Sequence, residues 1–334
     1  MYVERRGMYA DLEEARTSKV LLYVTGDRRG LATSISSEVY DFFVHHLDLI
    51  DVTDKITLIL YTTGGDTLAA WSLANLIRLY CDELEVVVPQ KARSAGTLMC
   101  LAADSIVMTK QATLGPIDPS VNTALNPEIP NAPPGSRVPV SVEGVGGYID
   151  FARSVLGEDR SQEVVFQRLV DSIHPLVLGS AFRARTQIRM LARKLMLTHQ
   201  KDNVAIERSL DFLCSESGSH DYTINRREAK SDLSLPILKP SPDEYALIKR
   251  IYDDFAAELE LNIPYDPRIV VGTEPNVDYS FPRALIESVH GGSHAFYSEG
   301  SILKTTLAHP TGIQQEALTD TRRFESWRHQ VVTS

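Results

Sequence analysis

The strongest constraint on the fold is an alternation of β-branched apolar runs with segments of helical spacing in the first third of the chain. Four runs have the composition of buried strands: residues 19–26, 55–66, 83–90 and 105–109. Three intervening segments carry apolar residues at helical spacing: residues 35–50, 68–80 and 97–103. This alternation predicts an α/β fold with a parallel sheet and right-handed crossovers. In such sheets, sites form where carboxyl ends of strands meet helix N-termini.

Later segments give different signals. Residues 116–145 are rich in proline, glycine and asparagine, which predicts a long loop or an insertion. Further helices are expected near residues 148–173, 180–199, 204–214, from Asn225, and over 241–261, where Ser-Pro-Asp-Glu is a helix-start signature. The segments RIVVG and HAFYSEG indicate short strands, and the sequence after them indicates a polar C-terminal tail.

Composition and charge exclude some classes of protein. The 334 residues are 43% hydrophobic and 23% charged, as in an ordinary globular protein. The net charge of −10 provides no global positive field for nucleic acid or an acidic membrane surface. Four arginines at helical spacing indicate a solvated face or a partner contact: Arg183, Arg185, Arg189 and Arg193. Because there is no signal-peptide core and no apolar run near about 18 residues, we expect a cytoplasmic protein without a membrane span.

Neither the cysteines nor the histidines indicate a metal site. The three cysteines lack metal-type spacing and are expected to be buried reduced thiols: Cys81, Cys100 and Cys214. Glycines between His290 and His294, with Glu299 nearby, leave no fixed ligand geometry. His45 and His46 lie on an expected helix as structural or surface residues. We therefore expect no metal and no cofactor.

Two strand-to-helix junctions carry residues suited to chemistry. Gly64–Gly65 follows the second expected strand, and Ser94 stands before the third expected helix, with the small residues Ala95 and Gly96 directly after it. The glycine pair could form a tight turn or bring backbone N–H groups close to a reacting oxygen. Ser94 could cap the helix or act as a nucleophile. The junctions alone leave both alternatives open.

Three segments in this order carry a resemblance: LYTTGGDTLAAWSLANLI, ARSAGTLMCLAADSIVM and ATLGPIDPS. They resemble the Clp-protease/crotonase fold and, more narrowly, the serine dehydrogenase proteinase family, which is related to signal peptide peptidase A. The resemblance implies that Ser94 is the nucleophile, and that the backbones of Gly65 and Ala95 stabilise the oxyanion. Gly64, Asp66 and Thr67 are expected to contact an extended peptide substrate.

The resemblance also implies a domain organisation. An N-terminal segment, residues 1–18, would precede a Clp/crotonase-like peptidase domain over 19–239, with 116–145 as a loop insertion. Residues 240–334 would form a mixed C-terminal extension. The family assembles into rings or layered oligomers, and the long helices between residues 148 and 214 could supply the contact surface.

The general base is where the sequence departs from the Clp pattern. Pro116 and Ile117 stand near the place of the Clp histidine. The lysine base of the signal peptide peptidase A relatives has no equivalent between residues 111 and 168. His220 is the leading alternative, because it lies beside Asp221, which matches the Clp-type aspartate by its spacing to Glu228.

Three other residues are alternatives for the general base. Lys110 ends the strand after the Ser94 helix and could serve as a desolvated lysine base. Asp118 lies between two prolines and is a weak base unless buried. Lys91 is close to Ser94 in the sequence but is expected to point to solvent.

The sequence thus predicts an ATP-independent serine peptidase acting on peptides or unfolded segments through an acyl-enzyme on Ser94. No Walker-type phosphate loop is present, so any unfolding of substrates would need a separate unfoldase or adaptor. We expect a homo-oligomer. Two alternatives stay open: a peptide-binding scaffold without activity, and a crotonase-type acyl-CoA enzyme, for which Asp66 and Asp118 would be the available carboxylates.

Overall fold

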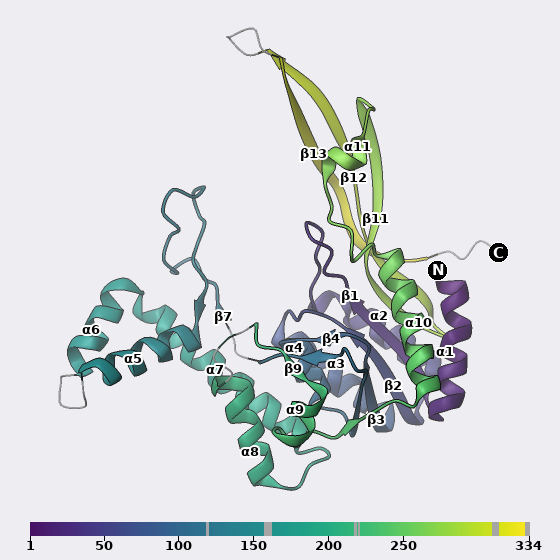
Figure 1. The fold of residues 1–334 in the computed structure, drawn as a ribbon, viewed down its shortest axis with the longest axis horizontal. Helices are drawn as coiled ribbons and strands as arrows, with labels where there is room; N and C mark the ends of the chain where they lie inside the picture. Colours follow the sequence, from purple (N-terminus) through teal and green to yellow (C-terminus); the bar gives the residue numbers. More distant parts are fainter. Residues whose placement is uncertain (118–119, 157–161, 217–218, 220, 309–313, 331–334) are drawn as a thin grey trace. The chain divides into compact units, whose positions relative to one another are not determined.

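The computed structural model describes residues 1–117, 120–156, 162–216, 219, 221–308 and 314–330. Contacts divide the chain into two units. The first consists of Met1–Thr113 together with Pro236–Ser334, and the second of Leu114–Leu235. Figure 1 shows the elements of both units.

The first unit is built on an eight-stranded sheet with the order β10-β5-β3-β2-β1-β11-β12-β13 (Figure 1). Its strands are β1 (Lys19–Thr25), β2 (Thr53–Tyr61), β3 (Cys81–Val88), β5 (Ser105–Met108), β10 (Ile237–Leu238), β11 (Asn276–Ser288), β12 (Gly292–Ala308) and β13 (Gln314–His329). From β10 to β1 neighbouring strands are parallel, and from β1 to β13 they are antiparallel. The α/β fold with parallel strands is therefore confirmed.

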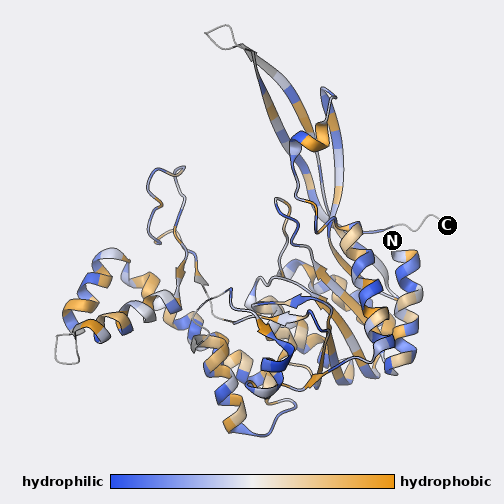
Figure 2. Cartoon of the chain, viewed as in Figure 1, coloured by the Kyte–Doolittle hydropathy of each residue, from blue (hydrophilic) through white to orange (hydrophobic). Residues whose placement is uncertain are grey.

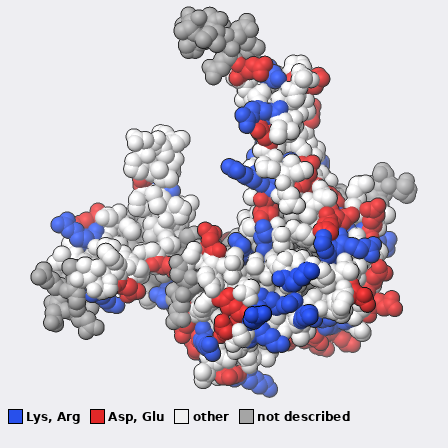
Figure 3. All heavy atoms as spheres, in the orientation of Figure 1, with Lys and Arg blue, Asp and Glu red and all other residues white. Residues whose placement is uncertain are grey.

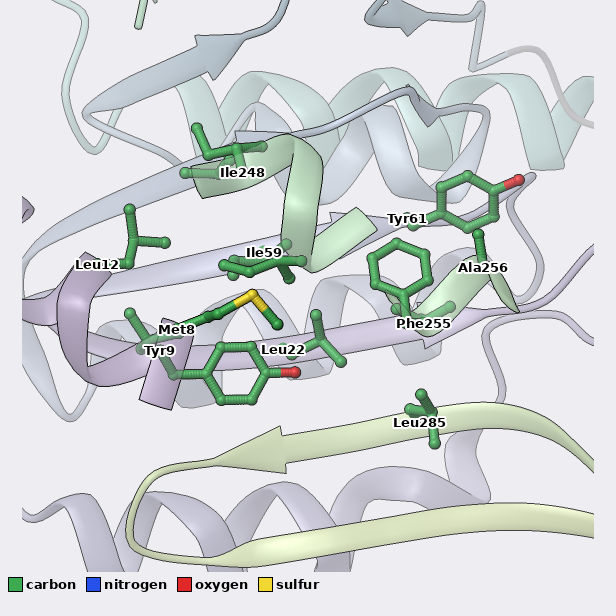
Figure 4. Close-up of a cluster of buried hydrophobic side chains, with 14 of the residues drawn as sticks. Met8, Tyr9, Leu12, Leu22, Ile59, Tyr61, Ile248, Phe255, Ala256 and Leu285 are labelled. Carbon is green, nitrogen blue, oxygen red and sulfur yellow. The ribbon is translucent and has the colours of Figure 1, made fainter. Parts of the chain in front are cut away.

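Helices cover both faces of this sheet. They are α1 (Tyr2–Arg16), α2 (Tyr40–Ile50) after the 3-10 turn η1 (Ser37–Val39), α3 (Thr67–Arg78), α4 (Ala95–Cys100), α10 (Pro242–Glu258) and α11 (Pro267–Val271). Tyr9 of α1 and Phe255 of α10 pack with Leu22 of β1 in one buried cluster (Figure 4). Tyr23 projects to the other face and meets Phe43 of α2 edge-on, with ring centroids 5.1 Å apart.

A buried polar network holds α1 on the sheet. Arg5 is fully buried, and its Nε and Nη2 donate to the two carboxylate oxygens of Glu287 on β11, at 2.9 and 2.7 Å. The hydroxyl of Tyr9 also donates to Glu287, and Arg5 Nη1 reaches Asp254 and Glu258 on α10. Because a buried charge must be paired, this network fixes α1, α10 and β11 together.

The second unit is mainly helical. It contains β7 (Ser120–Val121) paired antiparallel with β8 (Val140–Ser141), then α5 (Val142–Leu156), α6 (Gln162–Ser172), α7 (Pro175–Met196), α8 (Asn203–Asp211), the π-helix η2 (Phe212–Glu216) and α9 (Arg226–Ser231). Three further two-residue strands of the chain are β4 (Lys91–Ala92), β6 (Thr113–Leu114) and β9 (Ile224–Asn225). On α7, Arg189 and Arg193 pair with Glu207 of α8, so part of the expected arginine face is used inside the unit.

Two expectations about local structure are wrong. The segment RIVVG forms helix α11 instead of a strand, because Asp266 accepts a hydrogen bond from the N–H of Arg268 and Pro267 occupies the first turn. The expected polar tail contains the long strand β13, which pairs with β12 from His294↔His329 to Ala308↔Gln314.

Other expectations are confirmed or stay open. All three cysteines are free and buried. Among the described residues, no helix combines the length and the hydropathy that a bilayer crossing requires. The boundary expected at residue 240 stays a prediction; β11, beyond that boundary, pairs with β1 in the same sheet.

A histidine cluster lies where α2 meets β11 and β12. His46 is fully buried, and its Nδ1 and Nε2 lie 2.8 Å from Ser288 Oγ and 3.0 Å from His294 Nδ1. The rings of His45 and His329 lie 5.2 and 5.0 Å from the His294 ring. Burial, reinforced by the neighbouring histidines, lowers the pKa of His46 to about 3 and that of His294 to about 4.

This cluster predicts acid sensitivity. Because both folded-state pKa values lie below the ordinary value of about 6.5, the unfolded chain binds more protons than the folded one below that pH. The contribution of the neutral His46 and His294 side chains to stability is therefore complete above pH 6.5. It is lost progressively as the pH falls toward their folded-state pKa values of about 3 and about 4. Denaturant titrations should show the free energy of unfolding falling by about 2–3 kcal/mol between pH 7.5 and 5.5.

The control for this prediction is a histidine outside the cluster. His294→Gln should flatten the pH dependence, whereas His290→Gln, at an exposed position, should leave its slope unchanged. Equal slopes in His294→Gln and the wild type would contradict the assignment.

Candidate functional site

Ser94 has a backbone conformation that L-residues rarely adopt. It lies between β4 and α4 with φ 51° and ψ −119°, and its side chain accepts no N–H of the helix that it precedes. The structure therefore shows no side-chain cap at this position. A non-glycine residue in such a region costs on the order of 1–3 kcal/mol and persists only where its surroundings enforce it.

Gly64 lies directly against Ser94. A Cβ on Gly64 would be 2.7 Å from Ser94 Cβ and 3.2 Å from Ser94 Oγ, and Gly64 itself has a φ of 117°. Only glycine meets both requirements. The two junctions that the sequence singled out are thus in contact.

Gly65 packs against the backbone of Ile35 as closely as Gly64 packs against Ser94. Its φ is 146°, and an added Cβ would lie 2.3 Å from the Ile35 oxygen. The N–H of Ile35 donates to Gly64 O at 2.9 Å, and the N–H of Asp66 donates to Ile35 O at 2.8 Å. Because these bonds flank Gly65, its own N–H points away from Ile35.

The N–H groups of Gly65 and Ala95 have no acceptor within the described ranges of the chain. These are the two donors that the resemblance assigns to the oxyanion. Ala95 follows Ser94 directly, and Gly65 follows the glycine that contacts Ser94. The arrangement suits stabilisation of negative charge on an oxygen attached to a carbon that Ser94 attacks.

Thr62 connects the two junctions, and its role was not predicted from the sequence. Its Oγ1 accepts from the N–H of Gly64 at 3.0 Å and lies 2.6 Å from Thr25 Oγ1 on β1. Its backbone N–H donates to Lys91 O and its carbonyl accepts from the N–H of Arg93, both at 3.1 Å. The one available signal was the polar pair in YTTGG, at the end of an otherwise apolar run.

Asp66 and Thr67, expected to contact substrate, begin helix α3. The Asp66 carboxylate accepts from the N–H of Ala69 at 2.8 Å as the N-cap, and Thr67 is the first helical residue. Asp66 is exposed. The cap holds the chain after Gly65 in a fixed direction, and a direct contact of either residue with substrate stays a prediction.

Asp27, Tyr61 and Lys91 form a hydrogen-bonded cluster at the ends of β1, β2 and β3. Lys91 Nζ donates to Asp27 Oδ2 at 2.7 Å and lies 5.4 Å from the centre of the Tyr61 ring. The Tyr61 hydroxyl donates to Asp27 Oδ1 at 2.7 Å, and burial together with this carboxylate raises the Tyr61 pKa. The expectation that Lys91 points to solvent is wrong, because its side chain is 22% exposed and ion-paired.

The residues predicted as the general base lie in different parts of the chain, and some of them are outside the described residues. His220 and Asp118 lie outside the described residues. Asp221 belongs to the second unit, is exposed, and donates its N–H to Ser219 Oγ at 3.2 Å. Lys110 is exposed in the first unit, with Nζ 4.8 Å from the centre of the Tyr245 ring. Ser94 Oγ makes no hydrogen bond to any residue that the structure describes, and the base assignment stays a prediction.

In the described part of the chain, no three His, Cys, Asp or Glu side chains converge on a position that could hold an ion.

The contact between Gly64 and Ser94 gives a direct prediction. Gly64→Ala places a methyl group 2.7 Å from Ser94 Cβ, so Ser94 must move. We expect the rate at which a fluorophosphonate labels Ser94 to fall at least about tenfold, as expected when a reacting group is displaced. Intact-mass spectrometry measures this rate, and circular dichroism checks folding.

Gly7→Ala is the matched control. Gly7 lies in α1 with nothing within 4 Å of an added Cβ. The labelling rate should stay at the wild-type value, while helix stability rises by about 0.5–1 kcal/mol. Equal labelling of Gly64→Ala and Gly7→Ala would contradict the close approach.

One comparison with known proteins, a family model, agrees with the sequence resemblance. The family model of ClpP-like SDH-type serine proteinases matches residues 5–132. Two uncharacterised proteins of Methanocaldococcus jannaschii are similar. One is 30% identical over 198 residues, which are 59% of this chain and 58% of the relative. The other is 31% identical over 119 residues, which are 33% of this chain and 40% of the relative. The chain therefore matches less than two thirds of the length of either relative.

Two solved structures are also similar. Both are mutants of the 1510-N membrane-bound stomatin-specific protease, one of them in complex with a substrate peptide. The first is 14% identical with a TM-score of 0.39, and the match covers 68% of this chain and 83% of that structure. The second, which holds the substrate peptide, is 16% identical with a TM-score of 0.36, and the match covers 68% of this chain and 78% of that structure. The resemblance to the ClpP-like serine dehydrogenase proteinase family is confirmed, with the family match lying in residues 5–132.

Proposed function

We propose that this protein is an ATP-independent serine peptidase that hydrolyses peptides or unfolded protein segments through an acyl-enzyme on Ser94. The observation that carries the proposal is the contact of Ser94 with Gly64, beside two N–H groups, those of Gly65 and Ala95, that have no acceptor among the described residues. The family match over residues 5–132 supports peptidase chemistry in general.

The proposed reaction has two stages. Ser94 Oγ attacks the peptide carbonyl carbon, its proton passes to the base, and the carbonyl oxygen becomes an oxyanion that accepts from Gly65 and Ala95. The oxyanion collapses, and the amine leaves with the proton from the base. Water then attacks the acyl-enzyme by the same route and releases the acid. His220 with Asp221 is the proposed base, and Lys110 is the alternative.

The strained backbone of Ser94 favours this function over the alternatives. A scaffold that only binds peptides needs no serine held at φ 51° against a glycine. A crotonase-type enzyme would need a carboxylate at the site; Asp66 serves as the N-cap of α3, and Asp118 lies outside the described residues. The proposal keeps the cytoplasmic location and the separate unfoldase or adaptor expected from the sequence.

The test is covalent labelling of Ser94. Intact-mass spectrometry after incubation with a fluorophosphonate should show one adduct on the wild type, and peptide mapping should place it on Ser94. Ser94→Ala should show none, and Ser280→Ala, a matched change of an exposed serine on β11, should label like the wild type. A well-folded wild type that forms no adduct would contradict the peptidase and favour the scaffold.

The same assay distinguishes the candidate bases. Removing a general base slows nucleophilic attack by about 10²–10⁴-fold. His220→Ala should therefore label at least about a hundredfold more slowly, with Lys110→Ala unchanged. The reverse pattern would transfer the role to Lys110.

We also propose that the chain forms a homo-oligomer through the helices of the second unit. Large apolar side chains are exposed on α5, α6 and α7 (Figure 2): Phe151, Val155, Val164, Phe166, Leu176 and Phe182, at 57–70% exposure. Monomeric proteins seldom leave so many large apolar groups in water on neighbouring helices. A second copy of this surface, as the family resemblance implies, would cover them.

Light scattering tests this assembly. Phe182→Glu should lower the measured mass at micromolar concentration, because a charge in an apolar contact is desolvated without a partner. Phe324→Glu, on β13 at 41% exposure, is the matched control and should keep the wild-type mass. A wild-type mass equal to one chain would contradict the oligomer.

A further inference from the structure

Arg93, the residue before the proposed nucleophile, has no anionic partner among the residues that the structure describes. Its backbone is fixed, since its N–H donates to Thr62 O and its carbonyl accepts from the N–H of Gly96 at 2.8 Å. Its Nε is buried and has no hydrogen-bond acceptor in the described ranges of the chain. Among the described residues, no carboxylate forms an ion pair with its guanidinium.

The neighbouring carboxylate is already used. Asp27 accepts from Lys91 Nζ and from the Tyr61 hydroxyl, one bond to each carboxylate oxygen, both at 2.7 Å. Burial and Asp27 raise the pKa of Tyr61, and the positive charge of Arg93 opposes them weakly. The Asp27–Lys91 ion pair is therefore neutral by itself, and no carboxylate among the described residues compensates the charge of Arg93.

This uncompensated charge is unusual in the first unit. Other partly or wholly buried arginines there have carboxylate partners: Arg5 with Glu287, Arg16 with Glu85, Arg28 with Glu260 and Arg283 with Glu325. Figure 3 shows basic and acidic side chains interspersed on the visible surface of this unit. Because a partly buried cation without an anion is unfavourable, a ligand is the natural source of the missing charge.

We propose that Arg93 binds a carboxylate of the peptide substrate next to the scissile bond, and this inference rests on the proposed function. Consecutive Cα atoms are about 3.8 Å apart, so the Arg93 side chain starts within one residue of the attacking oxygen. A guanidinium matches a carboxylate with two parallel N–H···O bonds. The carboxylate can be an acidic side chain or the C-terminus of the peptide, since both present the same group.

Binding to a variant that cannot turn over tests the inference. Four fluorescent peptides of one sequence combine Glu or Gln at the central position with a free or amidated C-terminus. Fluorescence anisotropy measures their affinity for Ser94→Ala and for Ser94→Ala combined with Arg93→Gln. We expect one carboxylate to strengthen binding to Ser94→Ala at least about tenfold, and the Arg93→Gln change to abolish this preference. If the Glu peptides bind more tightly than the Gln peptides, the carboxylate is that of a side chain. If the peptides with a free C-terminus bind more tightly than the amidated ones, it is the C-terminal carboxylate.

Two controls separate the charge of Arg93 from other effects. Ser94→Ala with Arg6→Gln removes the same charge from an exposed position and should keep the preference. Arg93→Lys retains the charge without the planar fork and should show a preference reduced several-fold; it also provides the test if Arg93→Gln fails to fold.

The outcomes distinguish this inference from the proposed function. Equal affinity of all four peptides for Ser94→Ala, with the wild type labelled by fluorophosphonate, would overturn the role of Arg93 and leave the peptidase intact. A preference that depends on Arg93, with no labelling of the wild type, would retain the carboxylate site and reject the peptidase. A preference unchanged by Arg93→Gln would assign the carboxylate to another residue and overturn the inference.

Discussion

The contact between Ser94 and Gly64 is the constraint on which the rest of the site depends. Ser94 can hold φ 51° because Gly64 has no side chain where one would meet Ser94 Cβ at 2.7 Å. Gly64 is in turn fixed by Thr62 and Ile35, which bond its N–H and its carbonyl. The strain at Ser94 is therefore balanced by hydrogen bonds in the strand ends, as expected where a fold enforces an unfavourable backbone.

The parallel part of the sheet explains why these residues meet. β1, β2 and β3 are neighbours and run in the same direction, so the residues after them reach the same edge. Thr25, Thr62 and Lys91 come from these three strand ends, far apart in the sequence but joined by hydrogen bonds. The antiparallel strands from β11 onward extend the other side of the sheet and leave this edge unchanged.

The sequence predicted the elements whose signals are local. Buried strands such as β1 and the capped helix α10, with its Ser241–Glu244 capping box, lie close to where their patterns place them. β13 has a polar sequence without clear alternation and is a strand because β12 offers a partner along its length. α11 is a different case: its helix-start signal, Asp266 followed by Pro267, is local, and only its β-branched residues indicate a strand. The strand β13 depends on a distant partner, whereas α11 depends on its own N-cap.

The same distinction holds at the site. Ser94, Gly64 and Gly65 could be found from the sequence because glycine pairs and a serine at strand-to-helix junctions are local patterns. The role of Thr62 depends on Thr25, and the orientation of Lys91 depends on Asp27, each from a strand distant in the sequence. Periodicity carries no information on such pairs, so only the folded sheet reveals them.

Charge near Ser94 differs in sign from charge over the whole chain. The net charge is −10, yet Arg93, directly before Ser94, carries a positive charge that no carboxylate in the described part of the chain pairs. At physiological ionic strength, surface charges more than about 8–10 Å away are largely screened, whereas a partly buried guanidinium is screened much less. The acidic surface would therefore slow the approach of a carboxylate, mainly at low salt, while Arg93 would slow its departure. A preference for carboxylates is thus compatible with an acidic protein, because affinity at the site depends on the local charge.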